Sequence, residues 1–364
     1  MLDQLIEQSR SRRLTVLTFD PQRQSLAANQ PAVLRRVEPK QIRIAQPGLI
    51  VPFRADLFLE LNEIVRQRSA DEVIVELAGE VELPIARETL LHRFPGGIYL
   101  GNIARLTRSI RIVHANGLLE EFWVPQAVSE TEEIDVLSES AHSRAHGLAR
   151  SIECADALAM TDRAGVDQDT FRRAVQLLRG LNPTATIVDT GLKNFEPFPL
   201  ATSLDETPWN DDADREPHQL RSRWVVLDTN CARLMIRAAW PFHPQRFHEF
   251  VKGAWRGVLR GRGQVWIASQ PETYHLWSQA GRVGVLSPKI TGALSAHGEA
   301  SDKDWPQNMT FVGPKEVCAN ACRQLEECLL TEEEFELGPR LWHALVDPLR
   351  DVCTRGKVDS EPWI

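Results

Sequence analysis

The chain has 364 residues, of which 43% are hydrophobic and 25% are charged, and its formal net charge is −8. This composition is typical of a folded globular protein and excludes a largely disordered one, and the length suffices for two domains. The negative charge argues against nucleic-acid binding by the chain as a whole, although it does not exclude a local basic face. We expect no direct DNA binding.

The sequence carries no sign of a membrane or of secretion. Its apolar runs are short and broken by charges, so no membrane-spanning segment is expected. The first residues, 1–7, lack the basic and then apolar layout of a signal peptide. The six cysteines are scattered and include no Cys-x-x-Cys pair, which predicts reduced thiols. We therefore expect a cytoplasmic protein.

Strands alternate with helices through the first half of the sequence. The alternation predicts an α/β domain with a mostly parallel sheet and flanking helices. Apolar residues recur at helical spacing in several of the segments. Helices are predicted at 1–12, 56–67, 138–154 and 169–181, and strands at 14–19, 37–44, 73–77, 110–115, 155–160 and 186–188. The strands at 14–19, 73–77 and 110–115 are expected to be buried.

The alternation stops at 192–223, where four prolines and the acidic run Asp-Asp-Ala-Asp at 211–214 predict a linker or a solvated loop. Beyond it the pattern predicts a smaller α+β domain. Its expected elements are one or two strands at 223–237, a helix at 245–255, a strand region at 258–269, a helix at 314–330 and a capping box at 331–334. We therefore expect an α/β domain at 1–191, an acidic proline-containing linker at 192–222, an α+β domain at 223–350 and a tail at 351–364.

The segment 240–247, Trp-Pro-Phe-His-Pro-Gln-Arg-Phe, has a proline on each side of a Phe-His pair. Prolines stiffen the backbone and keep the preceding residue out of the helical region, so a strand-to-helix corner is expected. A second aromatic segment, Gly-Gln-Val-Trp-Ile-Ala, follows at 263–268, and Trp-Ser-Gln-Ala-Gly follows at 277–281. Together they resemble the C-terminal domain of the CobW family, P-loop GTPases that handle zinc or cobalt. The signature residues are Pro241, Phe242, His243, Pro244, Arg246, Phe247, Trp266, Trp277, Ser278, Gln279 and Gly281.

The resemblance implies nucleotide-binding motifs, and the sequence departs from them. The P-loop string G-x-x-x-x-G-K-[ST] is absent from the printed sequence. Residues 1–8 resemble the helix that follows such a loop. Either the loop was lost or it precedes the printed start, and a true loss is favoured because the later motifs are altered too.

Four residues are expected to be remnants of the family's nucleotide site. The acidic motif E-S-T-G-x-x-E-P corresponds to 76–84, where Glu76, Gly79 and Glu82 persist while the hydroxyl positions are apolar. Only Asp162 is left of the guanine-recognition motif N-K-x-D. Without the amide and the lysine of that motif, we expect poor base selection.

The family's metal motif, Gly-Cys-x-Cys-Cys, corresponds to Gly-Leu-Ile-Val-Pro at 48–52. Thiolates are the soft ligands that such a site needs, so we expect no metal there. His142 and His146 lie four residues apart on a predicted helix and could face one metal, but a solvated helix face is favoured. His243 could be a ligand or an acid/base group, but a hydrogen-bonded structural histidine at the corner is favoured.

Other features admit two interpretations each. Five tryptophans at 224–277 are expected to fill a core, not to form a binding hot spot. Cys318 and Cys322, four residues apart, are expected to be small core residues. The basic, glycine-rich segment 256–263 is either a tight hairpin with solvated arginines or a contact for RNA phosphates; the sequence favours neither.

Our first hypothesis for function is a non-catalytic binding protein, a degenerate CobW-like pseudo-GTPase that uses no cofactor. Its second domain would present a surface to a protein partner. The resemblance implies recruitment of a hibernation factor to the ribosome under zinc limitation. The alternative is a GTP-hydrolysing zinc or cobalt metallochaperone, which would use GTP, Mg²⁺ and Zn²⁺ and whose P-loop would lie before the printed start. A third, weaker hypothesis is a metal or small-molecule module built on His142 and His146.

Overall fold

The structure, a computed structural model, divides into two compact units. The first comprises Met1–Ile112, Arg150–Ala159 and Val188–Glu196, and the second comprises Val113–Ala149, Met160–Ile187 and Pro197–Ile364. The structure describes residues 5–6, 13–19, 32–36, 50–77, 83–84, 86–87, 100–122, 144–161, 165–190, 220–227, 230–281, 283–289 and 307–350. Most of the predicted linker lies outside these ranges, so the predicted domain boundaries stay a prediction.

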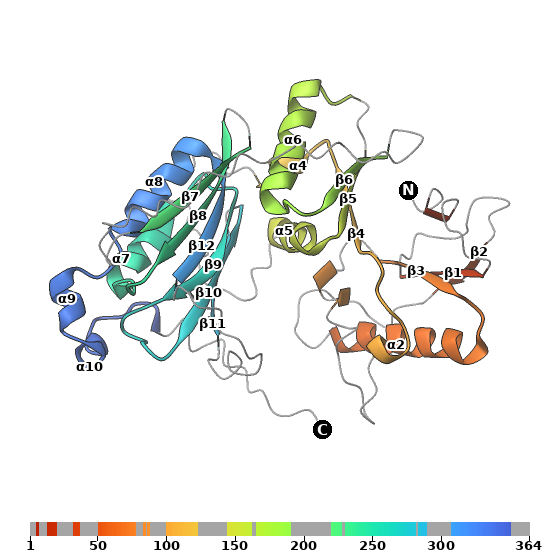
Figure 1. Cartoon of the computed structure of the whole chain (residues 1–364), viewed down its shortest axis with the longest axis horizontal. Coiled ribbons are helices and arrows are strands. Elements are labelled where there is room, and N and C mark those ends of the chain that lie inside the picture. Colours follow the sequence, from red (N-terminus) through yellow and green to blue (C-terminus); the bar gives the residue numbers. More distant parts are fainter. Residues whose placement is uncertain are drawn as a thin grey trace. The chain divides into compact units, whose positions relative to one another are not determined.

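The first described sheet is parallel and three-stranded, in the order β2-β1-β3 (Figure 1). Its strands are β1 (Leu14–Thr18), β2 (Ala32–Arg36) and β3 (Glu72–Glu76). Helix α2 (Ile50–Gln67) connects β2 to β3, as parallel strands require a crossover. Strand β1 is buried along its whole length, which confirms the prediction for this segment.

Helix α2 packs on this sheet because its apolar residues share one face. Leu57, Leu61 and Ile64 recur at intervals of four and three residues, which places them on one stripe. They form a buried cluster with Leu17 and Phe19 of the sheet. The predicted helix at 56–67 is therefore confirmed, and it begins six residues earlier than expected, at Ile50.

A second three-stranded sheet has the order β4-β5-β6 and is also parallel. Its strands are β4 (Ile110–His114), β5 (Ala157–Thr161) and β6 (Thr186–Asp189). Helices α4 (Leu118–Phe122), α5 (Arg144–Cys154) and α6 (Gln168–Leu181), with the 3₁₀ turn η2 (Leu100–Asn102), complete this part. The predicted α/β class is confirmed, with its described parallel strands divided between two sheets.

The third sheet is antiparallel and six-stranded, in the order β11-β10-β9-β12-β8-β7. Helices α7 and α8 lie on one of its faces (Figure 1). Its strands are β7 (Arg221–Val226), β8 (Cys231–Ala238), β9 (Arg260–Trp266), β10 (Tyr274–Ala280), β11 (Val283–Lys289) and β12 (Gln307–Pro314). Its helices are α7 (Pro244–Glu249), the π-helix η3 (Phe250–Ala254), α8 (Lys315–Glu326), α9 (Glu332–Glu336) and α10 (Pro339–Trp342). The predicted α+β part is confirmed.

The core of this part lies between the sheet and these helices. Alternate residues of β8, such as Leu234 and Ile236, are buried against it. Trp255 and Trp277 are each 1% exposed and meet edge to face, with ring centroids 6.1 Å apart. Trp224, Trp240 and Trp266 pack against the same cluster, so the tryptophans at 224–277 fill a core as predicted. Cys318 is fully buried here, and Cys322 is partly buried against it.

Several predictions differ from the structure. The segments at 73–77 and 110–115 were expected to be buried strands. However, β3 and β4 are edge strands of their described sheets, and Ile112 is 41% exposed. The helix expected at 314–330 ends at Glu326 because the following backbone pairs with the corner, where Leu330 N donates to Pro241 O over 3.0 Å. The strand expected at 37–44 lies outside the described residues.

The segment 256–263 fits neither interpretation at Arg260, where strand β9 begins. Strand β9 pairs with β10 on one side and with β12 on the other. The guanidinium of Arg260 is 3% exposed and donates to Ser278 Oγ over 2.9 Å and to the backbone oxygen of Gln279 over 2.8 Å. Arg260 is therefore neither a solvated hairpin arginine nor a contact for RNA phosphates.

No helix in the described ranges is long and apolar enough to cross a bilayer.

Candidate functional site

The first candidate position is the carboxyl end of the β2-β1-β3 sheet, because open α/β sheets bind ligands outside the carboxyl ends of their strands. There Thr18 Oγ1 donates a hydrogen bond to Glu76 Oε2 over 2.8 Å, and Phe19 N donates to Glu76 O over 2.8 Å. Glu76 is thus fixed at the edge where the acidic motif was expected. Gly79, Glu82 and Asp162 lie outside the described residues, so the proposed remnant as a whole stays a prediction.

A second polar pair ends neighbouring strands of the other parallel sheet. His114 closes β4 and Thr161 closes β5, and their Nδ1 and Oγ1 atoms are 2.9 Å apart. Thr161 directly precedes Asp162 in the chain, and both members of the pair lie at the carboxyl edge. Neither residue was predicted, although His114 is the last polar residue of the strand predicted at 110–115 and Thr161 directly follows the strand predicted at 155–160. Their atoms can donate and accept hydrogen bonds at the edge where a ligand would bind.

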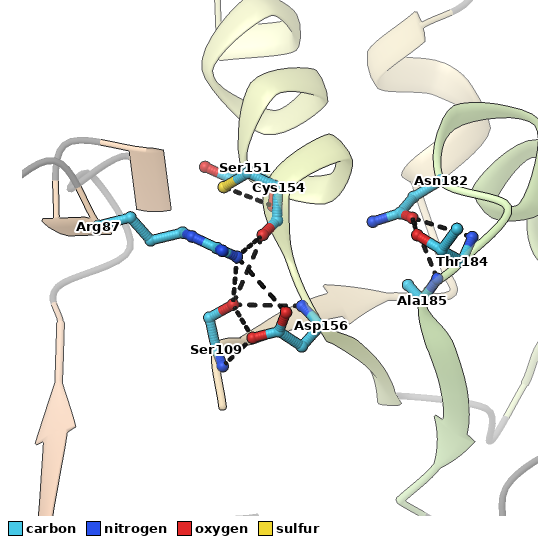
Figure 2. A network of polar contacts seen from close by, with 8 residues as sticks. All are labelled: Arg87, Ser109, Ser151, Cys154, Asp156, Asn182, Thr184 and Ala185. Atoms are coloured by element: carbon cyan, nitrogen blue, oxygen red, sulfur yellow. Dashed lines mark hydrogen bonds and ion pairs between the residues drawn. The ribbon is translucent and has the colours of Figure 1, made fainter. Parts of the chain in front are cut away.

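At the opposite, amino ends of β4 and β5, a polar network joins four residues (Figure 2). Asp156 Oδ2 accepts hydrogen bonds of 2.7 Å from both the backbone N and the Oγ of Ser109. Arg87 lies 3.5 Å from Asp156 Oδ1 and donates to the backbone oxygen of Cys154. Burial opposes ionisation of Asp156, but the hydrogen bonds from Ser109 and the charge of Arg87 outweigh it, so the pKa of Asp156 lies below its usual range.

This network is structural, because the amino ends of parallel strands are not where such sheets bind ligands. It ties the start of β4 to the start of β5. A similar tie follows α6, where Asn182 Oδ1 accepts from Thr184 Oγ1 over 2.9 Å and from Ala185 N over 3.0 Å (Figure 2). Asn182 thereby turns the chain from α6 into β6. Its place at the end of the helix was predicted.

The segment that corresponds to the metal motif has no ligating side chains where the structure describes it. Helix α2 begins at Ile50, so Ile, Val and Pro occupy its first turn. In the described ranges, no group of three or more His, Cys, Asp or Glu residues is arranged to hold a metal. His142 lies outside those ranges.

His146 corrects an expectation. It was expected on a solvated helix face, but its side chain is 5% exposed and its Nε2 lies 2.7 Å from Ser278 Oγ. Ser278 also accepts from Arg260, so the histidine joins α5 to strands β9 and β10 of the six-stranded sheet. The sequence did not predict this burial, because the contact joins residues 132 positions apart and depends on tertiary packing.

The corner at Pro241–Phe247 is connected by backbone hydrogen bonds to two other segments. Phe242 N donates to Trp266 O over 2.8 Å, and Ala268 N donates to Phe242 O over 2.9 Å. His243 N donates to Cys328 O over 2.8 Å. Pro244 begins α7, and the rings of Phe242 and Phe247 stack with centroids 5.0 Å apart. The predicted strand-to-helix corner is confirmed.

His243 is buried at this corner, with 9% of its surface exposed. Burial lowers the pKa of its imidazole, the charge of Arg246 lowers it further, and Glu334 opposes both effects. Its Nδ1 has no hydrogen-bond partner in the described part of the chain. The side chain therefore acts as a neutral packing group, and the hydrogen bond expected of a structural histidine is made by its backbone.

Arg246 and Glu334 form a two-pronged ion pair that ties α7 to α9. The two guanidinium nitrogens lie 2.9 and 2.6 Å from the carboxylate oxygens, and Arg246 also donates to Leu329 O over 2.9 Å. The hydrogen bond from Arg246 is the main cause that lowers the pKa of Glu334 to about 2. Glu334 also completes the predicted capping box with Thr331.

The Trp-Ser-Gln-Ala-Gly signature forms the end of β10 and the glycine after it, and Trp277, Gln279 and Ala280 are buried. Gln279 is fully buried, and its Nε2 donates to Val258 O over 3.0 Å and to Gly281 O over 2.8 Å. Gly281 has φ +58°, a conformation that favours glycine. A Cβ on Gly284 would lie 2.5 Å from the Trp277 ring, so the glycine makes room for the tryptophan. The contacts that the structure shows for Gln279 and Trp277 hold strands of the fold together.

Comparison with known proteins agrees with this geometry. Residues 232–329 match the model of the cobalamin synthesis protein cobW C-terminal domain. The chain is 24% identical over 335 residues to a zinc-regulated GTPase metalloprotein activator 1 of Dictyostelium discoideum, covering 82% of this chain and 67% of that protein. It is 28% identical over 326 residues to a zinc chaperone of Mycobacterium tuberculosis, covering 82% and 76% respectively.

Two solved structures also align with the chain. One is the Zn(II)-bound YjiA GTPase from E. coli, with 13% identity, a TM-score of 0.34, and coverage of 90% of this chain and 94% of that one. The other is a Zn(II)-bound triple mutant of YjiA GTPase, with 11% identity and a TM-score of 0.35. The resemblance stated from the signature residues is confirmed by the domain model.

Proposed function

We propose, from the premise that this chain carries a CobW C-terminal domain, that it is a non-hydrolysing relative of the zinc-handling proteins and works by binding a protein partner. Two of its relatives are named as a metalloprotein activator and a zinc chaperone, and both names describe an action on another molecule. A scaffold with a retained C-terminal domain and altered nucleotide motifs fits a role in binding.

The observation that carries this proposal is the first turn of α2. Val51 and Pro52 in that turn, and Leu49 directly before it in the sequence, stand where the family motif has thiols, and these side chains have no atom that can ligate zinc or cobalt. The base-recognition motif is reduced to Asp162 in the same way. Substitution of metal ligands and of base contacts in one chain supports loss of both activities together.

Direct titration tests the proposal. The full chain is titrated with a fluorescent GTP analogue in the presence of Mg²⁺, with the ATP analogue as a control for selectivity. We expect no saturable binding up to high micromolar concentrations and no GTP hydrolysis above background. Saturable binding that is selective for GTP would overturn the proposal and lead to assays of hydrolysis and metal transfer.

The partner we propose is the ribosome or a hibernation factor under zinc limitation. Tagged protein is isolated from zinc-starved cells and from zinc-replete cells, and ribosomal subunits are quantified in each. Enrichment in the zinc-starved sample alone is the expected result. Equal recovery from both samples, or none, would remove the ribosome from the proposal and leave an unidentified protein partner.

A second function is favoured by Glu76, which is kept at a carboxyl edge and fixed there by Thr18. The relative from Dictyostelium discoideum that is named as a zinc-regulated GTPase supports it as well. In this alternative, the chain is a GTP-hydrolysing zinc or cobalt metallochaperone with GTP, Mg²⁺ and Zn²⁺ as ligands, and the P-loop is encoded upstream of the printed start. An in-frame G-x-x-x-x-G-K-[ST] in the upstream codons is expected if this is correct, and its absence there would exclude the alternative.

A further inference from the structure

The face of the six-stranded sheet opposite α7 and α8 carries two rows of residues that are set by the strand register. Residues directly opposite on paired strands share a face, as do residues two apart along a strand. The first row crosses five strands and consists of Arg221, Arg237, Asn308, Gln264 and Leu276. We call this face the arginine face.

The second row lies two residues along each strand. It consists of Arg223, Met235, Thr310, Arg262 and Ser278. The two rows together hold four arginines and no carboxylate, although the whole chain has a net charge of −8. Positive charge is therefore concentrated on this face against the balance of the chain.

Arg221 and Arg237 stand directly opposite each other on β7 and β8. Like charges in that position destabilise a sheet, since their Cβ atoms are about 5 Å apart. Local rules of this kind are broken mainly at functional sites. Each of the four arginines also makes an interaction within the chain, so a ligand has to compete with that interaction.

The rest of the first row shows what kind of anion fits. Asn308 is exposed and follows Arg237, Gln264 is partly exposed, and Leu276 is 43% exposed at the end of the row. Arginine binds phosphate, whereas Asn and Gln amides pair with base edges and an apolar side chain contacts a base. An acidic peptide would use the arginines alone and leave these three side chains without a role.

We propose that the arginine face binds a single-stranded polynucleotide, with phosphates at the β7 and β8 side and bases toward β9 and β10. An open sheet surface suits a single strand, whose bases can spread over it, because the base edges of a duplex lie inside grooves. Four strand spacings of about 4.8 Å separate the outer strands of the row, which leaves room for a few nucleotides.

Packing covers the sheet beyond the second row. Along the next row, a Cβ on Gly180 of α6 would lie 2.8 Å from Val312, so α6 covers the sheet there. His146 of α5 reaches Ser278 at the end of the second row. The accessible part therefore centres on the first row.

Fluorescence anisotropy tests the proposal on the full chain with labelled rA12, dA12 and rU12 at 50 and 200 mM KCl. We expect saturable, micromolar binding of rA12 that weakens with salt. R221Q/R237Q should bind at least tenfold more weakly and should reduce the slope of log affinity against log salt by about 1.4, which is about 0.7 per phosphate contact. If circular dichroism shows misfolding of the double variant, R221Q serves, with half that change in slope.

The matched control is R172Q/R173Q, which removes two exposed arginines from α6 and should leave rA12 affinity within twofold. N308A/Q264A should reduce the preference for rA12 over rU12 without changing the salt slope. Tighter binding of rA12 than of dA12 would identify RNA as the ligand. Equal binding of the two would show that the face contacts phosphates and bases but does not distinguish RNA from DNA. No binding by the unmodified chain, equal loss in both charge variants, or competition by polyglutamate as strong as that by rA12 would overturn the proposal.

Discussion

At the scale of single residues, the signature of the C-terminal domain is a set of structural contacts. Arg246 is one example, because its guanidinium serves both Glu334 and the backbone of Leu329. The side chains of Arg246 and Glu334 are about two-thirds buried and are joined by two hydrogen bonds, so this pair stabilises the fold more than an exposed ion pair does. The signature therefore marks stability at this corner.

Arg246→Ala is expected to lower the free energy of unfolding by about 1–3 kcal/mol, because it leaves Glu334 and the Leu329 carbonyl without their charged donor. Urea unfolding followed by tryptophan fluorescence measures this. Arg172→Ala, which breaks an exposed pair with Asp169, is the control and should have a smaller effect. Equal effects of the two changes on the free energy of unfolding would show that the ion pair at the corner stabilises the fold no more than the exposed pair does.

The ion pair also predicts a dependence on pH. The pKa of Glu334 is about 2 in the fold and 4.5 in the reference state. Its contribution is therefore complete above pH 4.5 and is lost as pH falls toward 2. Glu334→Gln should not show this loss of stability, because a glutamine amide does not titrate. A stability profile of the variant that parallels the unmodified chain between pH 4.5 and 2 would contradict the assignment.

His275 predicts a second loss of stability on acidification, at higher pH than that of Glu334. It is fully buried in β10, and neither ring nitrogen has a hydrogen-bond partner among the residues that the structure describes. Burial lowers its pKa to about 4 against 6.5, with Asp347 opposing. The unfolded chain thus binds a proton that the fold excludes, so stability falls as pH drops from 6.5 to 4.

His275→Leu should flatten that part of the profile and should be neutral or stabilising at pH 7, because it removes two unsatisfied polar atoms. Thermal unfolding at pH 4 to 8 measures both effects. A variant that loses stability between pH 6.5 and 4 as steeply as the unmodified chain would show that another group titrates there.

At the scale of elements, strand β9 depends on a glycine. A Cβ on Gly263 would lie 2.1 Å from the backbone oxygen of Asn308 and 2.5 Å from Met309 Cα, both on β12. Backbone atoms in the centre of a sheet cannot move aside as the end of a side chain can. The pairing of β9 with β12 therefore requires a glycine at this position.

Gly263→Ala is expected to cost about 3 kcal/mol or more, at the upper end of overpacking effects. Gly117→Ala is the control, since nothing lies within 4 Å of its Cβ and only its φ of +87° opposes a side chain. That change should cost about 1 kcal/mol. Chemical denaturation separates the two, and a Gly263 variant as stable as the control would show that β12 can shift.

At the scale of the whole molecule, the chain forms two compact units, and all ten tryptophans lie in the second one. Tryptophan fluorescence therefore follows the second unit, whereas circular dichroism follows both. The Ser109–Asp156 network lies wholly in the first unit. We therefore expect that a change in the first unit can be told from a change in the second by comparing the two signals.

Asp156→Ala is expected to destabilise the first unit by about 1–3 kcal/mol, because it orphans the buried N–H and hydroxyl of Ser109. The midpoint seen by circular dichroism should fall while the fluorescence midpoint stays constant. Gly263→Ala should move the fluorescence midpoint instead. Equal movement of both signals in both variants would mean that the two units unfold as one.

The sequence by itself determined the features that depend on neighbours in the chain. The burial of β1, the end of α6 at Asn182, the corner at 240–247 and the capping box at Thr331 were predicted because periodicity, prolines and caps act over a few residues. The CobW C-terminal resemblance was likewise carried by short motifs. These parts of the fold are confirmed.

Only the tertiary structure decided the rest. Strand β10 was missed because His275 and Gln279 are buried in it, and polar residues at buried positions hide the alternation that predicts a strand. The contact between His146 and Ser278 and the opposition of Arg221 and Arg237 depend on helix packing and strand register, which join residues far apart in sequence. Local patterns contain no information about register, because register is fixed by the pairing of whole strands and by the core that they share.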